Sequence, residues 1–158
     1  MKFISELIQL IKLLFSGKPK DVSEIIIMRM KYFPFSNYLA MSWCGKLIIN
    51  SNVDKIDKST YNHEMIHLKQ SQQYGSWIGY YWKYLMEWLK GQPFRKPFNS
   101  AYYTNPFEVE AYANQNDENY WQNYNPENIS RYYLKDRRKL FAQQNSFNKW
   151  LQYIRKLG

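Results

Sequence analysis

Residues 61–70 read YNHEMIHLKQ and contain both histidines of the chain, His63 and His67, four positions apart. On an α-helix, side chains at positions i and i+4 lie above one another on the same face, about 6 Å apart along the axis. Two imidazoles in this arrangement can converge on one metal ion, each about 2.0–2.1 Å from a zinc. Glu64 follows the first histidine, so it would lie beside the metal, where a carboxylate can take a proton from a metal-bound water. We therefore interpret this stretch as the centre of a metal site on a helix.

The sequence around the two histidines favours that helix. Thr60 is a candidate N-cap, and Met65, Ile66 and Leu68 are good helix formers that supply an apolar face. Neither proline nor glycine interrupts the stretch before Gly75. The pattern H-E-x-x-H is typical of zinc peptidases when it lies on a helix.

Length and composition predict one domain over residues 1–158. Apolar residues make up 45% of the chain and aromatic residues 19%, which is too hydrophobic for a disordered protein. Fifteen tyrosines and six tryptophans indicate a core or cleft built from amphipathic rings.

Cys44 is the single cysteine of the chain. An intramolecular disulfide and a cysteine-based zinc site are therefore both excluded. We expect Cys44 to be a small buried hydrophobe, and the cysteine usage favours a reducing compartment such as the cytoplasm.

Residues 1–18 predict an amphipathic N-terminal helix. Their apolar residues fall at helical spacing, while Glu6, Gln9 and Lys12 interrupt the apolar run and no small-residue cleavage site follows, so the segment is not typical of a signal peptide. No stretch of 18 apolar residues occurs, and a membrane-spanning helix is not expected. The helix would pack on the domain or lie on a membrane surface.

The other expected elements give an α+β fold. We expect one strand over 24–33 that ends at Pro34, and one or two strands over 37–52 with a turn near Gly45. Within the latter, Lys46–Asn50 is a candidate edge strand, and the whole forms a short, mostly antiparallel sheet. Further helices are expected over 77–91, over 106–121 after Pro106, and over about 130–143 and 146–157, with a loop over 92–100.

The net charge of +9 is concentrated at the C-terminus. Residues 131–158 contain eight basic and one acidic side chain, whereas residues 61–130 contain five basic and seven acidic ones. A basic tail with aromatic residues is compatible with nucleic acid or anionic lipid. No nucleic-acid motif accompanies it, so we do not expect nucleic acid as a partner. Peripheral membrane contact is a further prediction for residues 1–16 or 77–90.

A catalytic zinc usually has three protein ligands and one open position. Because there is no third histidine, a carboxylate has to complete the site. Glu108 and Glu110 lie in the first turns of the helix that Pro106 opens. Two residues two positions apart on a helix point about 200° apart, so one of them would bind the metal and the other would not.

HEMIH followed about 40 residues later by FEVEAY resembles the gluzincin class of zinc peptidases. The layout over residues 40–115 is also similar to small bacterial zincin-like proteins with the patterns H-E-x-I-H-x-x-Q and P-F-E-x-E-A-Y. The resemblance implies a zincin-like domain with Zn²⁺ bound by His63, His67 and Glu108, and with Glu64 as the general base. In several of these families an Asp four residues after the ligand glutamate supports a histidine, and Tyr112 stands there in this chain.

The predicted activity is hydrolysis of peptide bonds in a peptide or protein substrate. A developing oxyanion needs a donor besides the metal, and Tyr102, Tyr103 and Arg131 are the candidates. An extended substrate could add to the predicted edge strand at Lys46–Asn50. The alternatives are a non-catalytic protein whose helices zinc holds together, and a membrane- or nucleic-acid-binding module that uses the basic tail.

Overall fold

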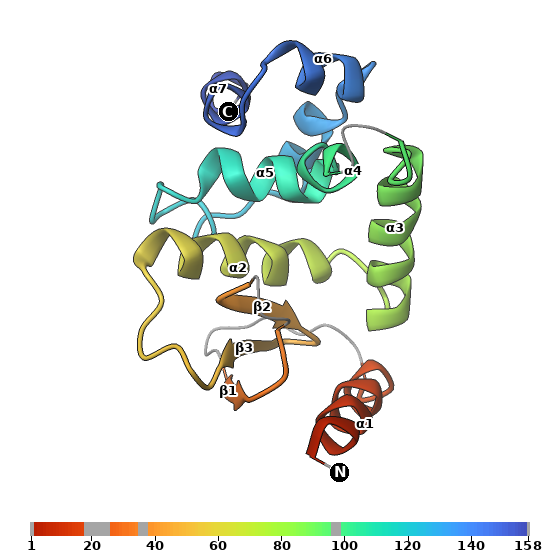
Figure 1. The fold of residues 1–158 in the computed structure, drawn as a ribbon, viewed down its shortest axis with the longest axis vertical. Coiled ribbons are helices and arrows are strands. Elements are labelled where there is room, and N and C mark those ends of the chain that lie inside the picture. The colour runs from red at the N-terminus through yellow and green to blue at the C-terminus, as the bar shows by residue number, and fades with distance from the viewer. Residues whose placement is uncertain (1, 18–25, 35–37, 96–98, 158) are drawn as a thin grey trace.

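A computed structural model describes residues 2–17, 26–34, 38–95 and 99–157. The described residues form a three-stranded sheet, seven α-helices and one 3-10 helix, so the expected α+β class is confirmed. The elements are stacked in layers, with the sheet, then α2 (Lys58–Ser71), then α5 (Pro106–Asn114), and then the C-terminal helices (Figure 1). The helix that carries both histidines therefore lies between the sheet and α5.

The sheet is mixed rather than mostly antiparallel. Its strands are β1 (Ile26–Met30), β2 (Ala40–Trp43) and β3 (Lys46–Asn50), in the order β1-β3-β2. β2 and β3 are antiparallel because a two-residue turn joins them, and both turn residues, Cys44 and Gly45, have positive φ angles, 49° and 78°. β1 pairs with the other side of β3 in the parallel direction.

The prediction that Lys46–Asn50 is an edge strand is wrong. β3 is the central strand, and Leu47, Ile48 and Ile49 are all buried because both of its faces are covered. β2 is an edge strand and lies next to α2. Part of the strand expected over 24–33 and part of the loop expected over 92–100 lie outside the described residues.

Helix boundaries follow local capping. Asp57, not Thr60, caps α2, because its carboxylate accepts a hydrogen bond from the Thr60 backbone N–H at 2.7 Å. The helix expected over 77–91 is confirmed as α3 (Trp77–Lys90), and Gly91 is its C-cap. The helix after Pro106 ends at Asn114, earlier than expected.

The C-terminal part of the chain differs most from expectation. A 3-10 helix, η1 (Pro126–Tyr132), and a short helix, α6 (Arg137–Gln143), replace the single helix expected over about 130–143. α7 (Phe147–Ile154) corresponds to the last expected helix. Trp150 and Ile154 of α7 pack with Val109 of α5 and with Tyr132 in one buried cluster. This cluster holds α5 in position from the side opposite α2.

The N-terminal helix is confirmed as α1 (Lys2–Leu14). Its buried residue Leu10 packs with Met30, Phe33 and Ile48 of the sheet region. The short helix α4 (Ser100–Tyr103) precedes α5. None of the helices in the described part of the chain combines the length and the apolar character that crossing a bilayer requires.

Candidate metal centre

α2 is buried on nearly all sides, which is unusual for a helix with so many polar residues. Nine of its fourteen residues are buried, and they include both histidines and Glu64. The buried polar side chains of a helix between two layers cannot reach water, so each of them needs a partner inside the protein. The partners of His63 and His67 define the candidate site.

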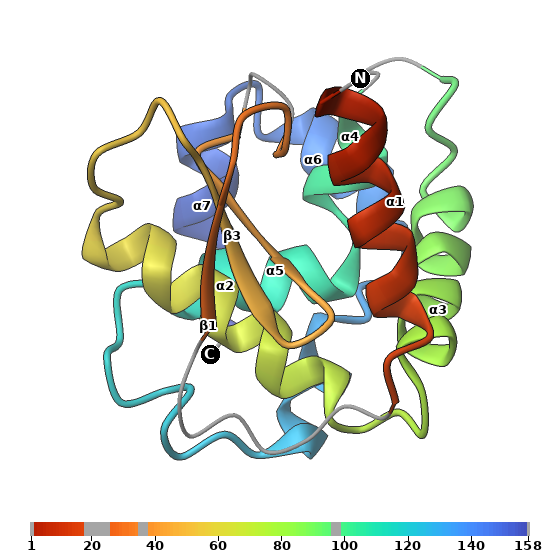
Figure 2. The same ribbon diagram turned by 90° about the horizontal axis from the view of Figure 1, so that it is seen from below.

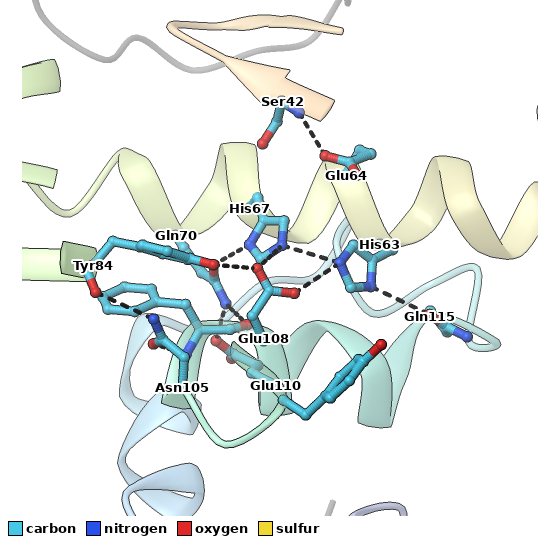
Figure 3. Close-up of polar contacts among 12 residues, drawn as sticks. Ser42, His63, Glu64, His67, Gln70, Tyr84, Asn105, Glu108, Glu110 and Gln115 are labelled. Carbon is cyan, nitrogen blue, oxygen red and sulfur yellow. Dashed lines mark hydrogen bonds and ion pairs between the residues drawn. The ribbon is translucent and has the colours of Figure 1, made fainter. Parts of the chain in front are cut away.

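The two imidazoles point from α2 toward α5, and Glu108 of α5 points back between them (Figure 3). His63 Nε2 lies 3.1 Å from His67 Nε2. Glu108 Oε2 lies 3.4 Å from His63 Nε2, and Glu108 Oε1 lies 3.4 Å from His67 Nε2. All three residues are buried, and together they form a group that could hold a metal ion.

These separations match the dimensions of a tetrahedral zinc site. Ligand atoms about 2.0–2.1 Å from a zinc, at the tetrahedral angle, lie about 3.3 Å from one another. The two Nε2 atoms are 3.1 Å apart, and each has a different oxygen of Glu108 at 3.4 Å, so each of these contacts is close to that spacing. Two imidazoles and one carboxylate also form a donor set typical of catalytic zinc, which leaves a fourth position open.

The Nδ1 atoms of both imidazoles already have hydrogen-bond partners within the protein. His67 Nδ1 lies 2.8 Å from Gln70 Oε1, and His63 Nδ1 lies 3.2 Å from Gln115 Oε1. Because a side-chain amide oxygen can only accept, each contact requires Nδ1–H as the donor. In the neutral rings both Nε2 lone pairs therefore face the centre of the group, as metal ligation requires.

Glu108 is oriented by Tyr84 of α3. The Tyr84 hydroxyl donates a hydrogen bond to Glu108 Oε1 at 2.7 Å. The other oxygen, Oε2, is buried and has no hydrogen-bond partner among the described residues. A buried carboxylate oxygen without a donor is costly, and a bound cation would satisfy it.

Glu110 lies on another side of α5 and has a different role. Its carboxylate accepts hydrogen bonds from Gln70 Nε2 at 2.8 Å and from the hydroxyls of Tyr120 and Tyr124 at 2.9 and 3.3 Å. Gln70 in turn contacts His67, so Glu110 holds the amide that orients this imidazole. The structure thus brings Glu108, and not Glu110, to the two imidazoles.

Without a metal, the group is a strongly coupled acid–base cluster. Burial acts to lower the pKa of His67, but the charge and hydrogen bonds of Glu108 outweigh it and raise this pKa to about 9. Burial acts to raise the pKa of Glu108, but His67 and His63 hold it well below its usual range. At neutral pH a metal ion would therefore have to displace a proton from the site.

Glu64 points away from α5, toward the sheet (Figure 3). Its Oε2 accepts a hydrogen bond from the backbone N–H of Ser42 in β2 at 2.5 Å. This contact fixes the carboxylate at the free edge of the sheet, because the opposite side of β2 pairs with β3. The second oxygen, Oε1, has no hydrogen-bond partner among the residues that the structure describes.

Two cavities adjoin the group. A cavity of about 350 Å³ is bordered by His67 and Glu108, and a smaller one of about 150 Å³ is bordered by His63, while Glu64 lines both. Aromatic residues dominate the walls of the larger cavity, namely Tyr38, Trp43, Tyr80, Tyr81, Tyr84 and Tyr102. The expected cleft of amphipathic rings is therefore present beside the candidate metal ligands.

The three candidates for the oxyanion donor occupy different places. Tyr102 lines both cavities. Tyr103 packs against Phe141 and Phe147 of the C-terminal helices, and Arg131 is an exposed residue of η1. Neither is among the described residues that border the two cavities.

Tyr112 does not substitute for the Asp that the resembling families often have. Its ring packs against His63 with centroids 4.5 Å apart and planes at 64°, so the contact is an edge-to-face one. The hydrogen bond to His63 comes instead from Gln115, three residues later. A ring contact and an amide thus share the positioning of this imidazole.

Sequence reasoning assigned no role to Gln70, Tyr84, Gln115 or Ser42. Gln70 follows His67 by three positions, so it could have been recognised as a neighbour on the same helical face. Tyr80, Tyr81 and Tyr84 share one face of the helix over 77–91, which would have indicated a tyrosine near the site. Gln115 and Ser42 act through tertiary contacts and leave no local signal.

Comparisons with known proteins give no further assignment. No family model, no curated protein and no solved structure matches this chain. The arguments for a metal site therefore depend on the geometry of His63, His67 and Glu108.

The contact between Gln115 and His63 is testable by substitution. Gln115→Leu removes the acceptor for His63 Nδ1–H, so the ring loses its fixed orientation. We expect zinc affinity to fall about 10–100-fold, as is typical for loss of a partner that orients a ligand. Competition with a chromophoric chelator measures this change.

Gln144→Leu is the matched control, because Gln144 is also a glutamine at the C-cap of a helix but lies on α6. It should leave the zinc affinity unchanged. Equal affinities for wild type and Gln115→Leu would show that Gln115 does not position the imidazole.

Zinc affinity should depend on pH with a definite sign. Since the metal-free protein holds His67 with a pKa of about 9, deprotonated imidazole becomes about tenfold more abundant with each pH unit from 7 toward 9. We expect the apparent Kd to tighten by about that factor per unit and to level off above pH 9. Titrations in buffers of different ionisation enthalpy should detect proton release at pH 7.5.

The stability of the metal-free protein should fall as pH rises, whereas its zinc affinity should increase. The folded-state pKa of His67 exceeds the unfolded value of about 6.5, so the protonated pair stabilises the fold below pH 6.5, and this contribution is lost as pH rises through about 9.

For zinc binding, a pH-independent Kd, or binding without proton release, would contradict the assignment of His67 as a ligand.

Proposed function

We propose that this protein is a zinc-dependent hydrolase that cleaves peptide bonds. The observation that carries the proposal is the buried group of His63, His67 and Glu108, in which one ligand atom of each residue lies within 4.8 Å of the others. Three such protein ligands would leave the fourth position of a catalytic zinc open. The resemblance of HEMIH and FEVEAY to gluzincin peptidases supports the same residues and the same metal.

Zinc bound there would supply Lewis acidity and lower the pKa of a bound water from about 16 toward about 7. The remaining chemistry belongs to side chains of this chain. Glu64 has one oxygen engaged by the Ser42 N–H and the other available to accept a proton from the attacking water. The same carboxyl group would then donate that proton to the leaving amine.

The walls of the site support an extended peptide as substrate. The larger cavity is bordered by Ala40, Met41, Ser42 and Trp43, which are the residues of the edge strand β2. A peptide could align with the free edge of β2 by strand addition, in place of the edge first expected at Lys46–Asn50. Glu64 lines both cavities, so groups on either side of the cleaved bond would have space.

Tyr102 is the oxyanion donor that this proposal favours. Its side chain lines both cavities, and burial together with the charge of Glu108 raises its pKa far above the usual range, so the hydroxyl stays protonated and able to donate. The proposal gives no catalytic role to Tyr103 or Arg131.

A structural zinc site is the alternative for the same residues. Such a site is closed by four protein ligands. The metal-binding group among the described residues contains three, and both cavities reach it. An open position beside a general base favours catalysis over a purely structural role.

Glu64→Gln tests the proposed mechanism most simply. The amide keeps the size of the side chain and can still accept from Ser42 N–H, but it cannot take a proton. We expect zinc content to be unchanged and the cleavage rate to fall by about 10²–10⁴-fold. Mass spectrometry of a mixed peptide library incubated with zinc-loaded protein measures cleavage.

Glu118→Gln is the control, because Glu118 forms an exposed ion pair with Lys58. It should cleave at the wild-type rate. Cleavage by Glu64→Gln at the wild-type rate, or cleavage that persists after the metal is removed, would exclude this mechanism.

A further inference from the structure

Two helices of the structure carry apolar stripes that the protein does not cover. On α1 and just after it, Ile4, Ile8, Ile11 and Phe15 are exposed, by 46–73%. On α3 the exposed apolar residues are Ile78, Trp82, Leu85 and Leu89, by 40–62%. Both sets follow the spacing i, i+4, i+7, i+11, so each lies along a single face of its helix.

The two helices are neighbours on one side of the molecule. α1 and α3 lie next to each other in both views, on the right (Figures 1 and 2). Trp43 connects them, because its Nε1–H donates to the Leu10 carbonyl of α1 at 2.9 Å and its ring stacks on Tyr81 of α3 at 4.4 Å. The two stripes therefore lie on adjacent helices, and together they are here termed the α1–α3 face.

The inner sides of these helices explain why the outer sides are not needed for the fold. Leu10 of α1 is in the core with Met30 and Ile48. Tyr80 and Tyr84 of α3 line the cavity beside the candidate metal ligands. The exposed stripes are additional apolar surface, and most of the exposed large hydrophobic residues in the described part of the chain lie on or next to these two helices.

Basic side chains outnumber acidic ones on the two helices of this face. Glu6 is the single acidic residue of α1, and its carboxylate accepts hydrogen bonds from the backbone N–H groups of Lys31 and Tyr32 at 3.0 and 2.9 Å. Lys2 and Lys12 of the same helix are exposed. Lys12 also borders a groove along α1, together with Ile4 and Ile8 of the apolar stripe.

Basic residues also outnumber acidic ones on α3. Glu87 is its single acidic residue and is 2% exposed. Lys83, Lys90 and Arg137 all contact this one carboxylate, so the end of the helix keeps a net positive charge. Arg95, a few residues after α3, is exposed beside Phe94, which is 81% exposed.

We propose that the α1–α3 face binds the surface of an anionic lipid bilayer. Apolar residues with exposed aromatic rings, on helices where basic side chains outnumber acidic ones, match the boundary between acyl chains and acidic headgroups. A second copy of the chain would bring like charges together, because Lys2, Lys12, Lys83, Lys90 and Arg95 outnumber Glu6 and Glu87 on and next to these two helices. Charge complementarity therefore selects the anionic bilayer as the occupant, and this inference is independent of the metal chemistry.

Co-sedimentation with vesicles tests the proposal. The full-length protein is mixed with phosphatidylcholine vesicles, with or without phosphatidylglycerol. We expect binding to the anionic vesicles, and we expect the double variant Ile8→Ser/Trp82→Ser to bind at least tenfold more weakly because it interrupts both stripes. The single variants should each give an intermediate loss, since both helices contribute.

Ile27→Ser is the matched control, because Ile27 is 55% exposed but lies on β1. It should bind as the wild type does, and circular dichroism should show the same thermal transition for all variants. Absence of wild-type binding to anionic vesicles would overturn the proposal. So would unchanged binding by the double variant, which would assign the interaction to the basic segment 131–158, or a wild-type dimer that the double variant dissociates without any vesicle binding.

Discussion

The structure depends on burying two imidazoles and a carboxylate against one another between α2 and α5. Desolvating these groups is unfavourable unless each has a partner. The protein satisfies the outer nitrogens with Gln70 and Gln115 and one carboxylate oxygen with Tyr84. The two Nε2 atoms and Glu108 Oε2 remain, and they face one another. A divalent cation between them would satisfy all three.

This constraint accounts for the layered architecture. The sheet covers one side of α2 and supplies the Ser42 N–H that holds Glu64. α5 covers the other side and supplies Glu108, and the cluster around Trp150 and Tyr132 supports α5 from behind. Tyrosines serve throughout because a ring fills space while its hydroxyl reaches a buried acid, as Tyr84 does for Glu108 and Tyr120 does for Glu110.

The sequence predicts the parts of the site that local geometry determines. The helical spacing of His63 and His67 predicts that their rings lie together, as they do in the structure. The choice between Glu108 and Glu110 needed the packing of α5, because both fall in its first turns and periodicity alone cannot say which face meets α2. Gln115 and Ser42 could not be found for the same reason, since each reaches the site from another element.

The fold was predictable to a similar degree. The turn at Cys44 and Gly45 determines an antiparallel hairpin, and this prediction is correct. The parallel pairing of β1 with β3 is non-local, so no turn in the sequence indicates it, and the central position of β3 was missed with it. The prediction of one helix over about 130–143 is wrong. Tyr132 packs in the core at the end of a 3-10 helix, and the α-helix that follows is shorter than expected.

The central claim is that His63, His67 and Glu108 bind one metal ion in tetrahedral geometry. X-ray absorption at the zinc edge, on protein loaded with one equivalent of zinc, tests it most directly. The account predicts four nitrogen or oxygen neighbours at about 2.0–2.1 Å, with multiple scattering from two imidazoles and no sulfur. A spectrum that shows zinc–sulfur scattering, six oxygen neighbours or no imidazole contribution would contradict it.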